Sequence, residues 1–337
     1  MRPIRPLPLL AATLVVAVGS LSLVALARHG SDGAAAAAGA PLPPGAPRYA
    51  LSTVGLSFPF AAAIAKGFRQ AAREAGAEGL VVDGKANIQK QANDIDDLIA
   101  QHPRGVAIMP LDSIVAQGWV KRAQAAGVPV VAVAALVGDP RTRAVQDVYP
   151  GLAALVSQDE VAAGRAAGTL AAQLLPADRP ARIAIVEGAA GFPEVDQRTR
   201  GFLASLAASG RRDTIVAAQP GNWTPDGGEA ACQNMLAADP RIDLFFNQAD
   251  DMVIGCARAV RAAGSHARLI GVGGSRLAMA SLKAGAIDGT VCFQPEALGA
   301  LAFRALAHPP APGTPRFLTY PIPAVTRASA QRCTGQW

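Results

Sequence analysis

Short apolar runs alternate along the chain with segments whose apolar residues recur at helical spacing. From residue 49 onward, the first such runs are Tyr49–Val54, Gly79–Asp83, Val106–Met109 and Val128–Val133. They are largely continuous, which is the pattern of parallel strands covered on both faces. Between the first two runs, Phe60, Ile64 and Phe68 recur every fourth residue and predict an amphipathic helix. Repeated β-α-β units of this kind predict a doubly wound parallel sheet.

A second series of the same kind begins near residue 158. A helix is predicted over Glu160–Leu174, and the strands that follow it are Arg182–Glu187, Thr214–Gln219, Leu244–Gln248 and Leu269–Val272. The predicted fold class is therefore α/β, with two similar doubly wound parallel-sheet lobes in tandem. Ligands of open α/β sheets bind beyond the carboxyl ends of the strands, so a small-molecule site is expected in a cleft between the lobes.

The first residues of the chain predict export. Arg2 and Arg5 precede an apolar run, and Ala25–Ala27 has the small-residue pattern of a signal-peptidase site, so residues 1–27 read as a signal peptide. The run is also long enough to span a bilayer, which leaves an uncleaved anchor as the alternative. Residues 28–48 are rich in Ala, Pro and Gly and predict a flexible linker. Either way, the rest of the chain is expected in the periplasm.

Composition and charge exclude several classes of protein. The 51% hydrophobic and 17% charged content of the 337 residues excludes extended disorder. The formal net charge of +6 comes without a run of Lys or Arg, which argues against nucleic-acid binding. No nucleophile motif is present, and no histidine has the partners of a zinc site among His29, His102, His266 and His308. Neither catalysis, a metal nor a cofactor is therefore predicted.

The four cysteines favour disulfide bonds, because their number is even and the chain is expected to be exported. Cys232 and Cys256 lie about two turns into consecutive predicted helices, where their sulfurs are at similar height. We expect these two to pair, which leaves Cys292 and Cys333 as the second pair. Free buried cysteine, which packs as a small hydrophobic residue, is the alternative.

Several segments in a fixed order carry a resemblance to a known family. In the first half they include GLSFPF at 55–60 and VVDGKANIQKQANDIDDLIA at 81–100. In the second half they include EGAAGFPEVDQRTRGF at 187–202 and FFNQADDMVIGCARAV at 245–260. Together these resemble the type I periplasmic binding proteins, the ribose-binding and LacI-like branch of ABC-transporter solute receptors. The resemblance extends from about Arg48 to Val325.

The resemblance implies two lobes and three crossings between them. The crossings would lie near Val156–Asp159, Val291–Gln294 and Ile322–Val325. The N-terminal lobe would comprise residues 49–156 plus 294–322, and the C-terminal lobe residues 157–293 plus 323–337.

The family implies a function in binding and not in chemistry. The lobes would close by hinge motion on one small-molecule ligand, and an ABC-transporter permease would recognise the closed form of the monomer. A periplasmic sensor subunit for a chemoreceptor or histidine kinase is the alternative. Repressor members of the family carry an N-terminal DNA-binding motif, but this chain has an export signal there, so no nucleic-acid partner is expected.

Ribose-type receptors stack the sugar between aromatic rings and bind its hydroxyls through polar side chains. The resemblance places Phe60 and Trp223 at the stacking positions, with Phe58 in place of an asparagine. Phe60 also begins the helical core stripe, so its ring is either part of the site or part of the core. The polar positions of the family are occupied here by Ala135, Asp196, Ala249, Gly273 and Phe293, with Gln294 one step beyond.

These departures predict an unusual ligand. Nearly all partners for sugar hydroxyls are lost, and the charges that remain are acidic: Asp196, with Asp159 and Asp250 as further candidates. An aromatic-lined, slightly acidic cleft suits a flatter neutral or cationic molecule better than a simple sugar. A carbohydrate, the default of the family, is the alternative. Arg198 is expected to be a structural charge partner.

The segment between Ala134 and Asp159 is about ten residues longer than in typical ribose-type receptors. Extra loops beside a cleft are commonly functional. We therefore expect this segment to pack near the hinge or the rim of the cleft.

Overall fold

In the computed structural model of the chain, residues 42–311, 313, 314 and 316–337 are described. The predicted signal segment and most of the predicted linker lie outside these residues. Of the linker, the structure shows a turn followed by the start of the first strand at Arg48. Among the described residues, no helix combines the length and the apolar character that a membrane crossing requires.

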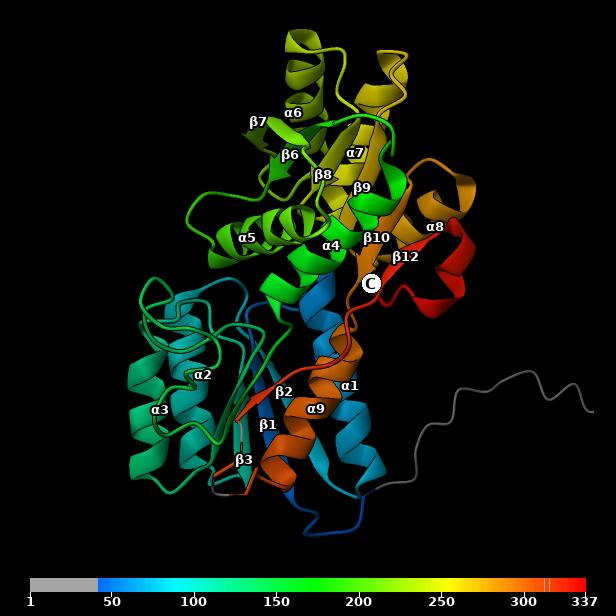
Figure 1. The fold of residues 1–337 in the computed structure, drawn as a ribbon. Helices are drawn as coiled ribbons and strands as arrows, with labels where there is room; N and C mark the ends of the chain where they lie inside the picture. Colours follow the sequence, from blue (N-terminus) through cyan, green and yellow to red (C-terminus); the bar gives the residue numbers. More distant parts are fainter. Residues whose placement is uncertain (1–41, 312, 315) are drawn as a thin grey trace, which may run out of the picture. The chain divides into compact units, whose positions relative to one another are not determined.

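The first sheet has six strands in the order β11-β5-β4-β3-β1-β2, and all five pairs are parallel. Its strands are β1 Arg48–Thr53, β2 Glu78–Asp83, β3 Gly105–Ile108, β4 Val130–Val133, β5 Ala154–Val156 and β11 Phe317–Leu318. The helices that cover it are α1 Pro59–Glu74, α2 Ile88–Ala100, α3 Ala116–Ala125 and α9 Pro295–Ala307 (Figure 1). Helices α1 and α9 pack against each other on one face, while α2 and α3 cover the other.

The second sheet has six strands in the order β12-β10-β9-β8-β6-β7, and only the β10–β12 pair is antiparallel. Its strands are β6 Arg182–Glu187, β7 Thr214–Pro220, β8 Leu244–Asn247, β9 Arg268–Gly273, β10 Gly289–Cys292 and β12 Ala324–Thr326. Its helices are α4 Glu160–Leu174, α5 Pro193–Ala208, α6 Pro225–Ala238, α7 Asp250–Ala262 and α8 Arg276–Ala284, with a 3₁₀ turn η1 at Arg327–Arg332. The predicted α/β fold class with two parallel-dominated sheets is confirmed.

Three connections join the two sheets. The chain passes from the first sheet to the second between β5 and α4, returns between β10 and α9, and passes again between β11 and β12. We call each sheet with its covering helices a half of the molecule. Because β10 belongs to the second half and α9 to the first, the residues between them lie where the two halves meet (Figure 1). The described residues of both halves form one compact unit.

Small residues let the helices of each layer approach closely. In the second half, α4 and α5 meet at Gly164 and Gly201, where a Cβ on either would overlap the backbone of the partner helix at Arg198 or Val161. Below this pair, Phe202 stacks on Phe246 of the sheet with ring centroids 4.2 Å apart. The close approach of the helices sets the position of Arg198, which belongs to the site described below.

The long segment between β4 and β5 lies only partly where the sequence predicts. At its start, the Gly138 amide donates to the Ser113 carbonyl (2.8 Å), which is beyond the carboxyl end of β3. Further on, Val148 and Leu152 are buried in the core beneath α2 and α3, and the Arg316 guanidinium donates to both of their carbonyls. The segment therefore begins at the carboxyl edge of the sheet and returns to its amino edge.

Candidate functional site

Trp223 is held in a strained position beyond the carboxyl end of β7. Its φ is +62°, and that of Asn222 is +54°, a region that bulky residues rarely occupy. The indole lies directly over Gly188, which follows β6, and a Cβ at position 188 would overlap the ring. Backbone strain of this kind persists only where the surrounding structure enforces it, and it gathers at functional sites. The geometry therefore singles out Trp223 as the centre of the candidate site.

Phe192 lies beside Trp223 and was missed by the sequence analysis. Its ring meets the indole edge to face at 6.0 Å, and the residue is 49% exposed. Phe192 precedes Pro193, the first residue of α5, just as Phe58 precedes Pro59, the first residue of α1. Each Phe-Pro pair follows the first strand of its half, so this repetition in the sequence was the available signal.

Arg198 of α5 is buried among the aromatic rings. Its Nε donates to Glu160 Oε2 (2.6 Å), and Nη1 donates to the Gln248 carbonyl (2.5 Å). The guanidinium carbon lies 5.6 Å from the centre of the Trp223 ring and 5.3 Å from that of Phe293. Arg198 thus pairs with a carboxylate, as the sequence analysis expects, and it also supports both rings. Glu160 was not recognised as its partner.

Burial and neighbouring charges act in opposite directions on the pKa values of Arg198 and Glu194. Burial alone would lower the pKa of Arg198, but the neighbouring Glu160 carboxylate raises that pKa above its usual value. Burial raises the pKa of Glu194, and Arg198 offsets part of this effect. The site therefore contains a fixed positive charge that is already paired, and a second carboxyl that burial drives toward its neutral form.

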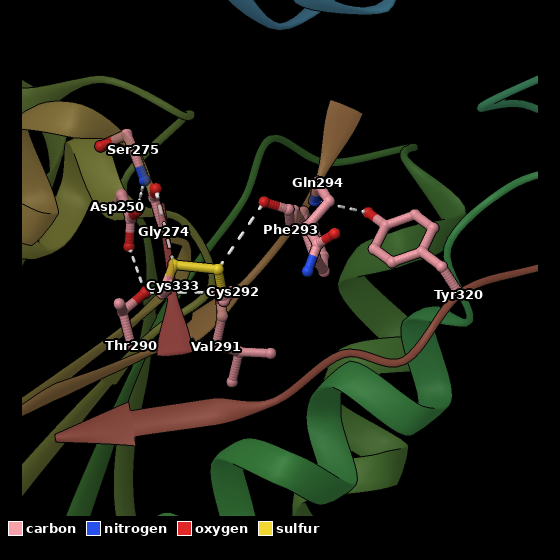
Figure 2. The surroundings of a disulfide bond; sticks show 10 residues. All are labelled: Asp250, Gly274, Ser275, Thr290, Val291, Cys292, Phe293, Gln294, Tyr320 and Cys333. Atoms are coloured by element: carbon pink, nitrogen blue, oxygen red, sulfur yellow. Dashed lines mark hydrogen bonds between the residues drawn. A yellow bond between two sulfur atoms is a disulfide. The ribbon is translucent and has the colours of Figure 1, made fainter. Parts of the chain in front are cut away.

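Two of the three expected acidic contacts make hydrogen bonds within the protein. Asp196 is exposed on the first turn of α5. Asp159 caps the N-terminus of α4. Asp250 is 4% exposed and accepts from Thr290 Oγ1 and from the Ser275 amide, both at 2.7 Å (Figure 2). Asp159 and Asp250 are therefore engaged by the protein itself, whereas Asp196 is exposed.

We expect Asp250 to make stability fall as the pH rises. Burial raises its pKa from 3.8 to about 6, so between these values the folded protein holds a proton that the unfolded chain has lost. Stability should therefore decline through this pH range by about 3 kcal/mol. Urea unfolding of the wild type and of Asp250→Asn at pH 4 to 7 checks this, because the variant lacks the titration. A difference in stability that stays constant with pH would contradict it.

Phe60 joins the two halves of the molecule. Its half-buried ring packs against both the core of α1 and α9 and the core of α4 and α5. It also meets the ring of Trp337 edge to face at 5.5 Å. By contrast, Phe58 is 47% exposed. The sequence left open whether Phe60 belongs to the site or to the core, and the structure shows extensive packing.

The remaining predicted positions lie at the carboxyl ends of strands. Ala135 follows β4, and Ala249 precedes α7. Gly273 ends β9 with φ +148°. Phe293 is buried after β10, and the Gln294 amide donates to the Tyr320 hydroxyl at 3.0 Å (Figure 2). Among the predicted residues, Trp223 and Phe293 both lie against Arg198, and the Phe293 amide donates to the Gly273 carbonyl at 2.8 Å.

Two disulfides cross-link the second half. Cys232 of α6 pairs with Cys256 of α7, with Cα atoms 5.3 Å apart. Cys292 at the end of β10 pairs with Cys333 after η1, with Cα atoms 5.8 Å apart (Figure 2). In the described part of the chain, no group of three or more His, Cys, Asp or Glu side chains is arranged to hold a metal ion.

The chain is similar to known proteins in both sequence and structure. A family model described as a periplasmic binding protein domain matches residues 49–308. The ribose import binding protein RbsB of Bacillus subtilis is 30% identical over 257 residues, which cover 76% of this chain and 79% of the relative.

Solved structures with bound ligands are similar as well. The Caulobacter myo-inositol binding protein, bound to myo-inositol, is 26% identical with a TM-score of 0.71, covering 85% of this chain and 95% of that one. A Mycobacterium smegmatis protein in complex with β-D-fucofuranose is 26% identical with a TM-score of 0.69, covering 85% and 93%.

Proposed function

The chain belongs to the periplasmic binding protein family, and from this premise we propose that it is the periplasmic solute-binding protein of an ABC importer. It captures one small molecule between its halves, and the closed form is recognised by a membrane permease. The three connections between the sheets support this proposal, because hinge closure needs two rigid bodies joined by a few flexible segments. Relatives named as import binding proteins support the transport role.

The ligand that we propose is a small ring compound with a broad apolar face. The observation that carries this is the indole of Trp223, which strained backbone and Gly188 hold beside Phe192. A ring stacked on this surface makes good dispersion and hydrophobic contact. Arg198 supplies charge, and two of its five N–H donors are engaged by Glu160 and the Gln248 carbonyl.

The ligands named for the relatives favour a carbohydrate as this ring compound. RbsB is named for ribose, and structural neighbours hold myo-inositol and β-D-fucofuranose. Each buried polar group left unpaired costs about 1–3 kcal/mol, so a ring with fewer hydroxyls fits this site better than a fully hydroxylated sugar. We therefore propose a deoxy sugar or a similarly weakly polar heterocycle. A cationic ligand, one of the two kinds expected from the sequence, is not part of this proposal, because Asp250 already accepts from Ser275 and Thr290.

A thermal-shift and calorimetry panel tests the ligand class. The panel comprises D-ribose, D-allose and myo-inositol, the deoxy sugars D-fucose and L-rhamnose, and the heterocyclic compound thymidine. A ligand at 100 times its Kd raises stability by about 2.7 kcal/mol, which is a clear melting shift. We expect shifts from the weakly polar members and little from the first three. Micromolar binding of D-ribose or D-allose would instead show that backbone groups and ordered water replace the missing side chains.

A further inference from the structure

Residues Cys333–Trp337, which we call the strap, are fastened to the second half of the molecule. The disulfide to Cys292 anchors the strap at the end of β10 (Figure 2). The Arg276 amide, at the start of α8, donates to the Trp337 carbonyl at 2.8 Å, and its guanidinium donates to the Gln336 carbonyl at 2.7 Å. Gly335 lies so close to Arg276 that a Cβ would crowd its backbone. The strap therefore has a defined path over the N-terminus of α8.

The same residues also contact the first half. The Glu296 amide, in the first turn of α9, donates to Gln336 Oε1 at 2.9 Å. The Trp337 ring meets Phe60 of α1 at 5.5 Å, with the ring planes 85° apart. Lys66 of α1 forms an ion pair with Glu296 at 2.7 Å, which ties the two contacted helices together. The strap thus touches both helices of one layer in the first half.

These contacts are suited to holding the two halves in place. The first N–H groups of a helix have no partner within the helix, and at α8 and α9 the strap supplies acceptors to one such group each. An edge-to-face aromatic pair adds attraction beyond the area that it buries. Because one end of the strap is covalently fixed, it makes these contacts with little loss of conformational freedom.

We propose that the strap is a clasp between the halves and that Trp337 is a positioning residue that fixes the Phe60 ring between them. The clasp limits how far the halves separate when no ligand is bound. It exists in the free protein, so only its consequence for ligand capture rests on the function proposed above.

The test compares two matched disulfide variants in the free protein. Cys292→Ser/Cys333→Ser releases the strap, whereas Cys232→Ser/Cys256→Ser removes a bond between α6 and α7. Their sequence separations, 41 and 24 residues, give similar losses of chain entropy. Trp337→Ala removes the aromatic contact alone, and Trp337→Phe should restore most of it.

Two measurements on the ligand-free protein test whether the strap acts as a clasp. Amide hydrogen exchange at Arg276 and Glu296 should become about tenfold faster in the strap-release variant, because these amides lose their acceptors. The radius of gyration from small-angle scattering should rise by about 1 Å from an expected ~19 Å. The α6–α7 control and Trp337→Phe should match the wild type in both.

Unchanged exchange in the strap-release variant, together with an unchanged radius in that variant and in Trp337→Ala, would overturn the proposal. Equal changes in the α6–α7 control would overturn it as well, because they would indicate a general loss of stability. A failure of every compound in the ligand panel would count against the proposed function while leaving these measurements unaffected.

Discussion

Replacing Trp223 by alanine is expected to weaken ligand binding about 100-fold or more while leaving the fold intact. An indole face that covers about 100 Å² of ligand contributes ~2.5 kcal/mol through burial. Stacking adds about 0.5–1.5 kcal/mol. Titration calorimetry with the tightest compound of the ligand panel, together with thermal melting of the free protein, measures both effects.

Two variants serve as controls for this result. Trp223→Phe keeps a ring over Gly188 and should retain most of the affinity. Trp119→Ala removes an indole that is 1% exposed in the core of α2 and α3, and it should lower the melting temperature strongly. If Trp223→Ala destabilised the free protein as much as Trp119→Ala does, Trp223 would be a core residue and not a ligand contact.

Replacing Arg198 by alanine should lower the free energy of unfolding by about 3–5 kcal/mol. The reason is that the variant leaves the Glu160 carboxylate buried without its partner, and the Gln248 carbonyl loses a donor. Trp223 and Phe293 would also lose the guanidinium against which they lie. Chemical denaturation of the free protein measures the loss.

A double variant separates the charge from the packing. Arg198→Met/Glu160→Gln removes both charges at similar volume and should recover most of the stability, since a buried pair is often no better than an apolar replacement. Arg122→Ala breaks an exposed pair with Asp96, whose side chains are 48% and 52% exposed, and should cost less than about 1 kcal/mol. A loss at Arg198 no larger than that at Arg122 would contradict the expectation.

The architecture was predictable because most of its strands are covered on both faces. Strands such as β3 and β4 are wholly buried, and their apolar runs stand out in the sequence. The strand β11, with two residues, and β5 and β12, with three each, are too short to show a pattern and were not identified. Their places in the sheets depend on pairing with distant strands, which no local signal encodes.

The candidate site was predictable only in part, and α5 shows why. Asp196 and Arg198 are two residues apart, so on a helix they point to nearly opposite sides. Alignment of motifs selected Asp196, but the side that faces the rings carries Glu194 and Arg198, which are four residues apart. For Asp250, the donors that occupy it come from Ser275 and Thr290 in later turns and strands. Only the three-dimensional structure brings them to one carboxylate.

The contact between Trp223 and Gly188 also constrains how this protein can diverge. While the indole lies on position 188, any side chain there would displace the ring, so the glycine cannot change first. Once a smaller residue stands at 223, position 188 becomes free to vary. Among descendants of this chain, a side chain at position 188 is therefore expected only after position 223 has changed, which gives the two substitutions a fixed order.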